Sequence, residues 1–249
     1  MVTTRRNFIR TGLIFVPSCV HGQLATTVFR RRSIDLIGYP ATVPGLQFIL
    51  KPDSLYFMAD GDPVGLWQDS TLSGNNASAS GTARPTYRTA AFNVGGYPGI
   101  EFDGTSDVMS MVSCVYLNRT TGGTLFMVLK WTAPSVSGFI TSAMWLNNLN
   151  QVTVSDGGAF YTSAATTTAK KMLTLRGLGA NLTVRVNKTA LSTLTPYTND
   201  WPILCQMGTY LTNWFTGTIG DIIQYNRSLS DAECDAMYDL YLKPKYTLP

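Results

Sequence analysis

Two groups of side chains in this 249-residue sequence have types and spacing suited to sugar recognition. Trp145 with Asn147 and Asn148, and Trp214 with Asn213, each place an aromatic ring beside carboxamides in a polar, loop-like stretch. Ligand sites combine aromatic surface with a few placed polar groups, so both groups are candidate contacts for a surface glycan. The alternative interpretation is that these rings pad an edge of the fold or a subunit contact.

Carboxylates suggest two further chemistries, sugar hydrolysis and calcium binding. Glycoside hydrolysis needs two carboxylates that face each other across the scissile bond. Glu101 and Asp103 are close in sequence, but Asp103 also begins a turn at Gly104, so we expect no catalytic residues. Calcium prefers clustered oxygen ligands. The residues that could supply them are Asp60, Asp62, Asp69 and Asn76. Asp-Gly and Asp-Pro pairs are common in turns, so we expect turn roles for these residues and neither a metal site nor a cofactor, with calcium as the open alternative.

The chain has four cysteines and one histidine. Cys19, Cys114, Cys205 and Cys234 lack the spacing of metal ligands, and the histidine, His21, lies close to the N-terminus. Zinc binding and Ser-His-Asp catalysis are therefore not expected in the folded body. Apolar neighbours around the last three cysteines favour buried free thiols. A disulfide among them is the alternative if the protein matures outside a reducing cytosol.

The elements that must position these residues are predicted to be short strands. Charged residues make up 14% of the chain and hydrophobic residues 45%, so the chain can bury a sizeable core. Short apolar runs separated by turn residues are typical of an all-β protein. Residues 124–131 are almost continuously apolar, as in a strand buried on both faces. Ile100 and Phe102 alternate with polar residues, as in a half-buried strand.

A short helix is predicted near the end of the sequence. Ser230 is a natural N-cap, and Glu233 three residues later completes a capping box. The residues that would then share one helical face are Cys234, Met237, Tyr238 and Tyr241. We expect Pro244 to end this helix, because proline lacks the backbone donor that a helix interior needs.

Two sets of motifs, in this order, resemble the concanavalin A-like (LamG-type) jelly-roll family. The first set is Leu66-Trp67-Gln68-Asp69-Ser70, Ser73-Gly74-Asn75-Asn76 and Gly99-Ile100-Glu101-Phe102-Asp103-Gly104. The second is the final strand 215–225, followed by Asn226-Arg227-Ser228-Leu229-Ser230. The resemblance implies an antiparallel jelly-roll β-sandwich with a short C-terminal helix and a sugar-binding or glucanase ancestry. Glucanases of this fold carry Glu-x-Asp-x-x-Glu, and no second Glu follows Asp103 here, so we expect no enzymatic activity.

We divide the sequence into an N-terminal arm with its linker (residues 1–45) and a jelly-roll domain (residues 46–249). Residues 4–10 resemble a twin-arginine export signal, and the apolar run after them is too short to span a bilayer. We favour an arm that binds a partner and only resembles a signal, and a signal cleaved after Gly22 is the alternative. The candidate partner-binding residues of the arm are Arg5, Arg6, Phe8, Arg10, Arg30, Arg31 and Arg32.

A body without catalytic residues, in a fold used for surface display, leads to a functional hypothesis. We expect a structural or adhesion protein of a virion, such as a phage capsid decoration, fibre or tail component. The arm would anchor it to other virion proteins and to copies of itself. The alternative is a twin-arginine-exported bacterial carbohydrate-binding protein of the periplasm or cell surface. The net charge of +4 arises largely in the arm, so we expect no nucleic-acid binding through the body and no membrane span.

Overall fold

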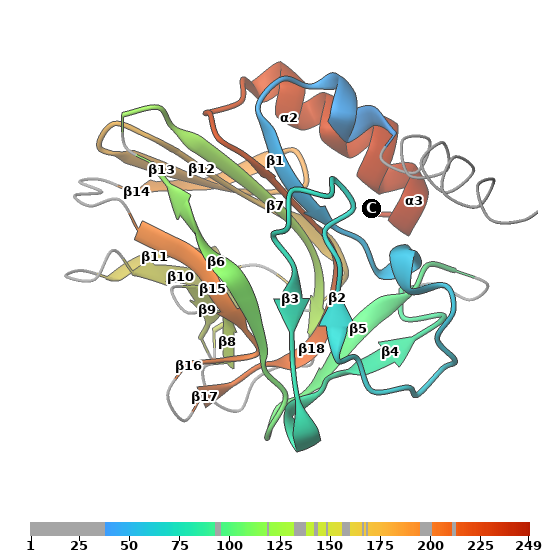
Figure 1. Ribbon diagram of the computed structural model, residues 1–249. Helices are drawn as coiled ribbons and strands as arrows, with labels where there is room; N and C mark the ends of the chain where they lie inside the picture. Colours follow the sequence, from blue (N-terminus) through green and yellow to red (C-terminus); the bar gives the residue numbers. More distant parts are fainter. Residues whose placement is uncertain are drawn as a thin grey trace, which may run out of the picture.

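The computed structural model of the protein is a sandwich of two antiparallel β-sheets with helical turns along one outer face (Figure 1). The structure describes residues 38–249 apart from 93–95, 119, 132–137, 142–143, 148, 156–159, 166, 168, 195–200 and 211–212. The arm residues proposed above as a partner site (Arg5, Arg6, Phe8, Arg10, Arg30, Arg31 and Arg32) lie outside the described residues. The predicted all-β sandwich with a short C-terminal helix is confirmed.

The first sheet, sheet A, is built around a long strand near the end of the chain. Across the sheet the strands are β14 (Thr189–Leu194), β13 (Asn181–Val186), β12 (Lys171–Leu178), β7 (Gly123–Trp131), β18 (Thr216–Tyr225), β5 (Gly99–Asp103) and β4 (Thr86–Arg88). A further strand, β1 (Leu46–Leu50), pairs with the second half of β18, and β5 pairs with its first half. β18 therefore connects β1, β5 and β7 into one sheet.

The second sheet, sheet B, faces sheet A across the core. Its strands, in spatial order, are β11 (Phe160–Ala165), β10 (Gln151–Ser155), β9 (Met144–Leu146), β8 (Gly138–Thr141), β15 (Trp201–Met207), β6 (Met109–Leu117), β3 (Ala77–Ser78) and β2 (Leu66–Trp67). A small hairpin of β16 (Thr209–Tyr210) and β17 (Asn213–Trp214) lies next to β8. Short 3₁₀ turns complete the connections: η1 (Tyr39–Thr42), η2 (Pro52–Leu55) and η3 (Gly81–Ala83).

Two hydrophobic layers pack against the two faces of sheet A. The inner layer, between the sheets, contains Trp67, Phe102 and the inward-facing residues of β7. The outer layer lies between sheet A and the C-terminal helices and contains Phe126 and Val128 from the opposite face of β7. The prediction that residues 124–131 form a strand buried on both faces is therefore confirmed. Ile100 and Phe102 are also buried, as their alternation predicted.

The C-terminal segment folds as α2 (Asp231–Met237), a π-helical turn η4 (Tyr238–Leu242) and α3 (Lys243–Tyr246). The predicted capping box between Ser230 and Glu233 is present. The prediction that Pro244 ends the helix is wrong, because the chain passes through η4 and starts α3 with Pro244 in its first turn. A first-turn residue needs no intrahelical donor, so proline is tolerated there.

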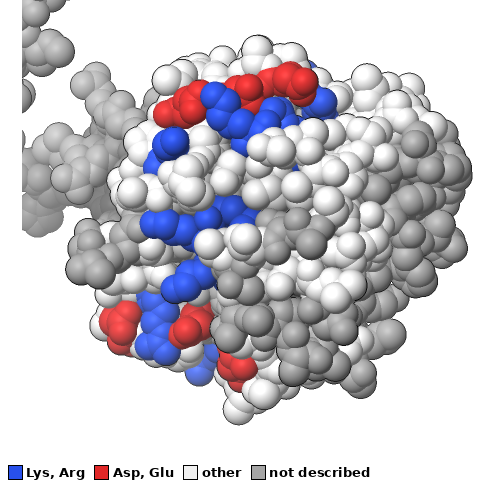
Figure 2. Space-filling model, turned by 180° about the vertical axis from the view of Figure 1, so that it is seen from behind, with Lys and Arg blue, Asp and Glu red and all other residues white. Residues whose placement is uncertain are grey.

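Charge complementarity attaches α2 to sheet A. Asp231 accepts a hydrogen bond from Arg176 of β12 at 2.6 Å, and Asp235 accepts one from Arg185 of β13 at 2.7 Å. On the back of the molecule, Figure 2 shows acidic and basic side chains gathered side by side at the upper edge. In the described part of the chain, no helix is long and apolar enough to cross a membrane.

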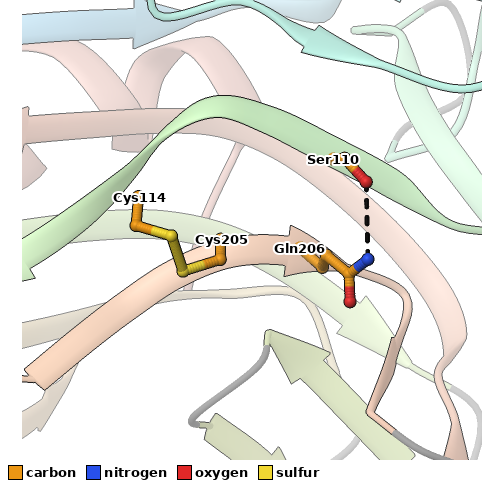
Figure 3. The surroundings of a disulfide bond; sticks show 4 residues. All are labelled: Ser110, Cys114, Cys205 and Gln206. Carbon is orange, nitrogen blue, oxygen red and sulfur yellow. Dashed lines mark hydrogen bonds between the residues drawn. A yellow bond between two sulfur atoms is a disulfide. The ribbon is translucent and has the colours of Figure 1, made fainter.

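A disulfide between Cys114 of β6 and Cys205 of β15 joins neighbouring strands of sheet B (Figure 3). The expectation of buried free thiols is therefore wrong for these two cysteines, and it is correct for the buried Cys234. In the pairing of these strands Ser110 lies opposite Gln206, and Val115 lies opposite Leu204. β6 therefore has more residues than β15 between these two pairs and forms a bulge there. Sequence spacing could not reveal this contact, because the two cysteines are 91 residues apart.

Candidate functional site

A polar cleft of about 230 Å³ opens between β1 and β18 of sheet A on one side and β6 of sheet B on the other. We call it the amide cleft, because carboxamides dominate its wall. Its lining residues are Gln47, Phe48, Asn75, Cys114, Asn118, Thr121, Gly122, Gln224 and Asn226.

Backbone pairing sets the sheet A side of the amide cleft. Phe48 lies opposite Gln224 in the β1–β18 ladder. Phe48 belongs to the inner core together with Ile222, which precedes Gln224 by two positions. Because alternate strand residues share a face, the carboxamide of Gln224 points toward the space between the sheets. Gln224 is only 6% exposed, so it forms part of the floor of the cleft.

Asp69 fixes the turn that carries Asn75 to the cleft. Its carboxylate is buried and accepts hydrogen bonds from the backbone N–H groups of Ile49, Thr71 and Asn75 at 3.1, 2.9 and 3.3 Å. The carboxamide of Asn76 accepts the N–H of Asp69 at 2.8 Å. These contacts tie the turn after β2 to strand β1, so Asn75 has a defined place on the wall.

The hairpin between β6 and β7 closes another side of the cleft. The Asn118 carboxamide accepts the backbone N–H groups of Thr120 and Thr121 at 2.8 and 2.9 Å. Gly122 has a φ of 81°, and a Cβ atom on it would lie 2.6 Å from the backbone nitrogen of Ser228. Only glycine fits this position, which brings the hairpin against the segment that follows β18.

Several cleft carboxamides retain hydrogen-bonding capacity. The Gln224 side chain donates to the carbonyl of Tyr225 at 3.1 Å, and its oxygen accepts no hydrogen bond from a described residue. The side chains of Asn75 and Asn226 likewise make no hydrogen bond within the described part of the chain. Each carboxamide both donates and accepts, as does a sugar hydroxyl. The arrangement can therefore bind a polyhydroxylated ligand.

The first sugar-contact candidates lie away from the amide cleft. Trp145 is on β9 between β8 and β10, and its side chain and the whole of Asn148 lie outside the description. The Asn147 carboxamide accepts the N–H groups of Leu149 and Gln151 and donates to the Gln151 side chain. Asn147 therefore stabilises the β9–β10 turn with the groups that a sugar would need.

The second pair, Asn213 and Trp214, is in β17 and is half-buried. The carbonyl of Asn213 accepts the hydroxyl of Thr209 at 3.1 Å. β17 and β9 both lie next to β8, so the structure brings the two candidate groups to the same region of sheet B (Figure 1). Their role in ligand binding stays a prediction.

The acidic residues considered for hydrolysis are used in local structure. Glu101 pairs with Arg88 of the neighbouring strand β4. Asp103 accepts the backbone N–H groups of Thr105 and Ser106 at 2.8 Å each. Burial would raise the pKa of Asp103, but hydrogen bonds from these residues and from Asp107 outweigh burial and hold the pKa well below its usual range. Asp103 thus has the turn role predicted for it.

Asp107 has the opposite titration behaviour, which gives a first testable prediction. Burial raises the pKa of Asp107 from 3.8 to about 6, although its carboxylate accepts the N–H of Asp103 at 2.8 Å. An acid with a raised folded-state pKa contributes stability that is full below pH 3.8 and lost as the pH rises through 6. Asp107→Asn is expected to stabilise the protein at pH 7.5 by roughly 1–3 kcal/mol and to change little at pH 4.

Urea unfolding of wild type and variant at both pH values measures this difference. Asp103→Asn is the matched control, since it removes a carboxylate whose ionised form is stabilised, and it should destabilise the protein at pH 7.5. An Asp107→Asn variant less stable than wild type at pH 7.5 would contradict the assignment.

The candidate calcium ligands also have separate structural roles. Asp60 accepts the N–H of Thr89 at 2.9 Å, and Asp62 accepts the N–H of Ala59 at 2.7 Å. Asp69 and Asn76 hold the turn beside β1, as described above. Among the described residues, no three His, Cys, Asp or Glu side chains form a group that could hold a metal ion.

Sequence reasoning missed the amide cleft, although its parts carried signals. Asn75, Asn118 and Asn226 all stand in turn segments, and Gln224 follows two isoleucines in β18. A glutamine on the same strand face as the buried Ile222 was the clearest signal, because a buried polar residue needs partners. The convergence of these four residues depends on pairing between β1 and β18 and on contact between the two sheets, which no local pattern encodes.

Comparison with known proteins shows the fold. Neither protein-family models nor curated protein sequences match this chain. Among solved structures, the sialidase of Trypanosoma rangeli in complex with sialic acid matches with a TM-score of 0.59 and 15% identity, over 87% of this chain and 38% of that one. The chain thus spans well under half of the sialidase.

Two further solved domains are also similar. Domain 4 of AbnA, a GH43 extracellular arabinanase from Geobacillus stearothermophilus in complex with arabinotriose, gives a TM-score of 0.53 at 10% identity, over 78% of this chain and 98% of that one. The binding domain of Paraclostridial Mosquitocidal Protein 1 gives 0.56 at 11% identity, over 79% of this chain and 52% of that one. At these identities the likeness establishes a shared β-sandwich fold.

Proposed function

We propose that this protein is a non-catalytic carbohydrate-binding module of the concanavalin A-like type and that the amide cleft is its ligand site. The observation that carries the proposal is the convergence, at one opening of the sandwich, of carboxamides from Asn75, Gln224 and Asn226 that retain hydrogen-bonding capacity. The similarity to a domain whose structure contains arabinotriose supports a sugar as the ligand.

We further propose that the protein works outside a reducing cytosol. The exposed position of Cys114 leaves the Cys114–Cys205 disulfide accessible to cellular reductants. Disulfides persist in oxidising compartments such as the periplasm, the cell surface and the extracellular space. This observation favours the exported carbohydrate-binding protein over a cytosolic one, with residues 46–249 as the binding domain and residues 1–45 as its leader or arm.

Binding to immobilised glycans, followed by titration calorimetry with the best ligand, tests the proposal. Gln224→Ala and Asn226→Ala are each expected to weaken binding about 5- to 12-fold, because each removes hydrogen bonds worth about 1–1.5 kcal/mol. The matched control is Asn181→Ala, which removes an exposed carboxamide from a different groove and should leave affinity unchanged.

Trp214→Ala separates the amide cleft from the earlier candidate region on sheet B. Loss of binding in Trp214→Ala, with full binding in Gln224→Ala and Asn226→Ala, would move the site to β17. If the protein binds none of the glycans, the proposed function is wrong.

The virion role remains a separate hypothesis for the same sandwich. It requires an intact arm, because the arm would hold the protein in the particle. The intact mass of the protein from its native source distinguishes the two hypotheses. A mass that corresponds to a chain beginning near Gln23 favours export. A mass that corresponds to a chain containing Arg5 and Arg6 favours an assembly arm.

A further inference from the structure

The described side chains that line the amide cleft carry no formal charge. Its polar side chains are the carboxamides of Gln47, Asn75, Asn118, Gln224 and Asn226 and the hydroxyl of Thr121. Proteins bind a ligand carboxylate mainly with arginine, lysine or a set of convergent backbone N–H groups. Among the described residues that line the cleft, none is a lysine or an arginine.

Of the two arginines that adjoin lining residues in sequence, Arg119 lies outside the described residues, and Arg227 is engaged elsewhere. Arg227 follows Asn226, but its Nη1 atom lies 3.0 Å from Glu233 and its Nε atom donates to the carbonyl of Pro44 at 2.9 Å. Its side chain lines a different groove, together with Arg176 and Ser230. Arg227 therefore provides no cation to a ligand in the amide cleft.

A buried carboxylate lies directly behind the wall. Asp69 is 2% exposed, and its two oxygens accept the N–H groups of Ile49 and Asn75. Asn75 lines the cleft, and Ile49 follows the lining residue Phe48. Charges inside a protein are screened less than charges in water. The negative charge of Asp69 therefore disfavours the binding of a ligand carboxylate in the cleft, and it does not disfavour the binding of a hydroxyl group.

We infer that the amide cleft selects uncharged sugar residues and discriminates against sugars that carry a carboxylate, such as sialic and uronic acids. This inference rests on the proposed function and names the class of sugar that the same cleft takes. A volume of about 230 Å³ lies below the range of drug-sized pockets and suits one sugar residue of a longer chain. Hydroxyl groups of that residue exchange hydrogen bonds with Asn75, Gln224 and Asn226.

Matched ligands test the inference on the intact protein. Oligogalacturonides and sialyl-oligosaccharides are measured by calorimetry at pH 7 beside their methyl esters, which keep the sugar skeleton and remove the charge. Neutral arabino-, xylo- and gluco-oligosaccharides complete the panel. Methyl esters and neutral sugars are expected to bind at least tenfold more tightly than the free acids.

Two variants place this discrimination in the amide cleft. Asn226→Lys puts a cation at an exposed position of the wall and should reduce the ratio of ester to acid affinity severalfold or reverse it. Asp69→Asn retains an acceptor oxygen and should also reduce the ratio. Circular dichroism and thermal melting establish that each variant is folded, and Asn226→Lys gives the test if Asp69→Asn does not fold.

The possible outcomes distinguish a failure of this inference from a failure of the proposed carbohydrate-binding function. Free acids that bind as tightly as their esters, or more tightly, would overturn the inference and leave the carbohydrate-binding function in place. A ratio unchanged by Asn226→Lys in a folded protein would also overturn it. A panel in which no sugar binds would overturn both.

Discussion

Removal of the Cys114–Cys205 disulfide is expected to lower the free energy of unfolding by about 3–5 kcal/mol. The crosslink spans 91 residues, and a long closed loop restricts the unfolded chain strongly. It also joins β6 to β15 at the bulge of β6, where the strand pairing is irregular. The double variant Cys114→Ser/Cys205→Ser, unfolded in urea beside wild type, measures the effect.

A reductant provides the internal control for this experiment. Reduced wild-type protein should unfold at the same urea concentration as the double variant, and the double variant should not respond to the reductant. Because Cys114 lines the amide cleft, loss of the crosslink should also weaken sugar binding. A reductant-insensitive midpoint in the wild type would show that the crosslink does not contribute to stability.

Lys245→Met is the second substitution with a large expected effect, a loss of about 3–5 kcal/mol. The Lys245 ammonium lies 2.9 Å from the Asp221 carboxylate and 3.2 Å from Asp53. Burial alone would lower the pKa of Lys245, but the charges of Asp221 and Asp53 outweigh burial and raise it. Asp221 is fully buried on the outer face of β18, so removal of the lysine leaves a buried carboxylate without the ammonium group that contacts it.

The hydroxyl of Tyr246 links this ion pair to the backbone. It donates to Asp221 at 2.6 Å and accepts the N–H of the same residue at 2.9 Å. A Cβ atom on Gly220 would lie 2.9 Å from the Tyr246 ring, so glycine permits this close approach. The ion pair and the tyrosine together attach α3 to sheet A, and their loss should release the C-terminal segment.

Thermal and urea unfolding check the Lys245 prediction against two further variants. Lys188→Met removes an exposed ion pair with Asp239 and should leave the unfolding free energy unchanged within error, since water screens exposed pairs. The double variant Lys245→Met/Asp221→Asn should recover part of the lost stability, because it removes the unpaired charge. Equal stability of Lys245→Met and Lys188→Met would contradict the assigned role of the buried pair.

Local patterns in the sequence were sufficient to predict several elements. The apolar run 124–131 predicts a strand buried on both faces because each of its two faces needs an apolar cover, and the structure supplies the inner core and the helices. Ser230 and Glu233 predict the start of α2 because both halves of a capping box lie within one turn. These predictions depend only on neighbours close in the chain.

Contacts between segments that are distant in the chain could not be predicted from such local patterns. Cys114 and Cys205 meet because β6 and β15 are neighbours in sheet B, and the amide cleft forms because β1 pairs with β18. Pro244 was wrongly expected to end the helix because the π-helical turn before it had no sequence signal. Polarity and aromaticity single out Asn147 and Trp214, and these properties suit a turn, a packed edge and a ligand site alike, so their role in ligand binding stays a prediction.

The place of β18 in the sequence has a consequence for synthesis. Each strand that pairs with β18 precedes it in the chain, and β18 holds β1 and β5 in sheet A. A nascent chain that has not reached Thr216 therefore cannot complete this sheet, and the apolar faces of β1 and β7 remain uncovered. Native pairing of this kind is slow because it waits for distant partners. The growing polypeptide would thus depend on chaperones until its last strand emerges from the ribosome.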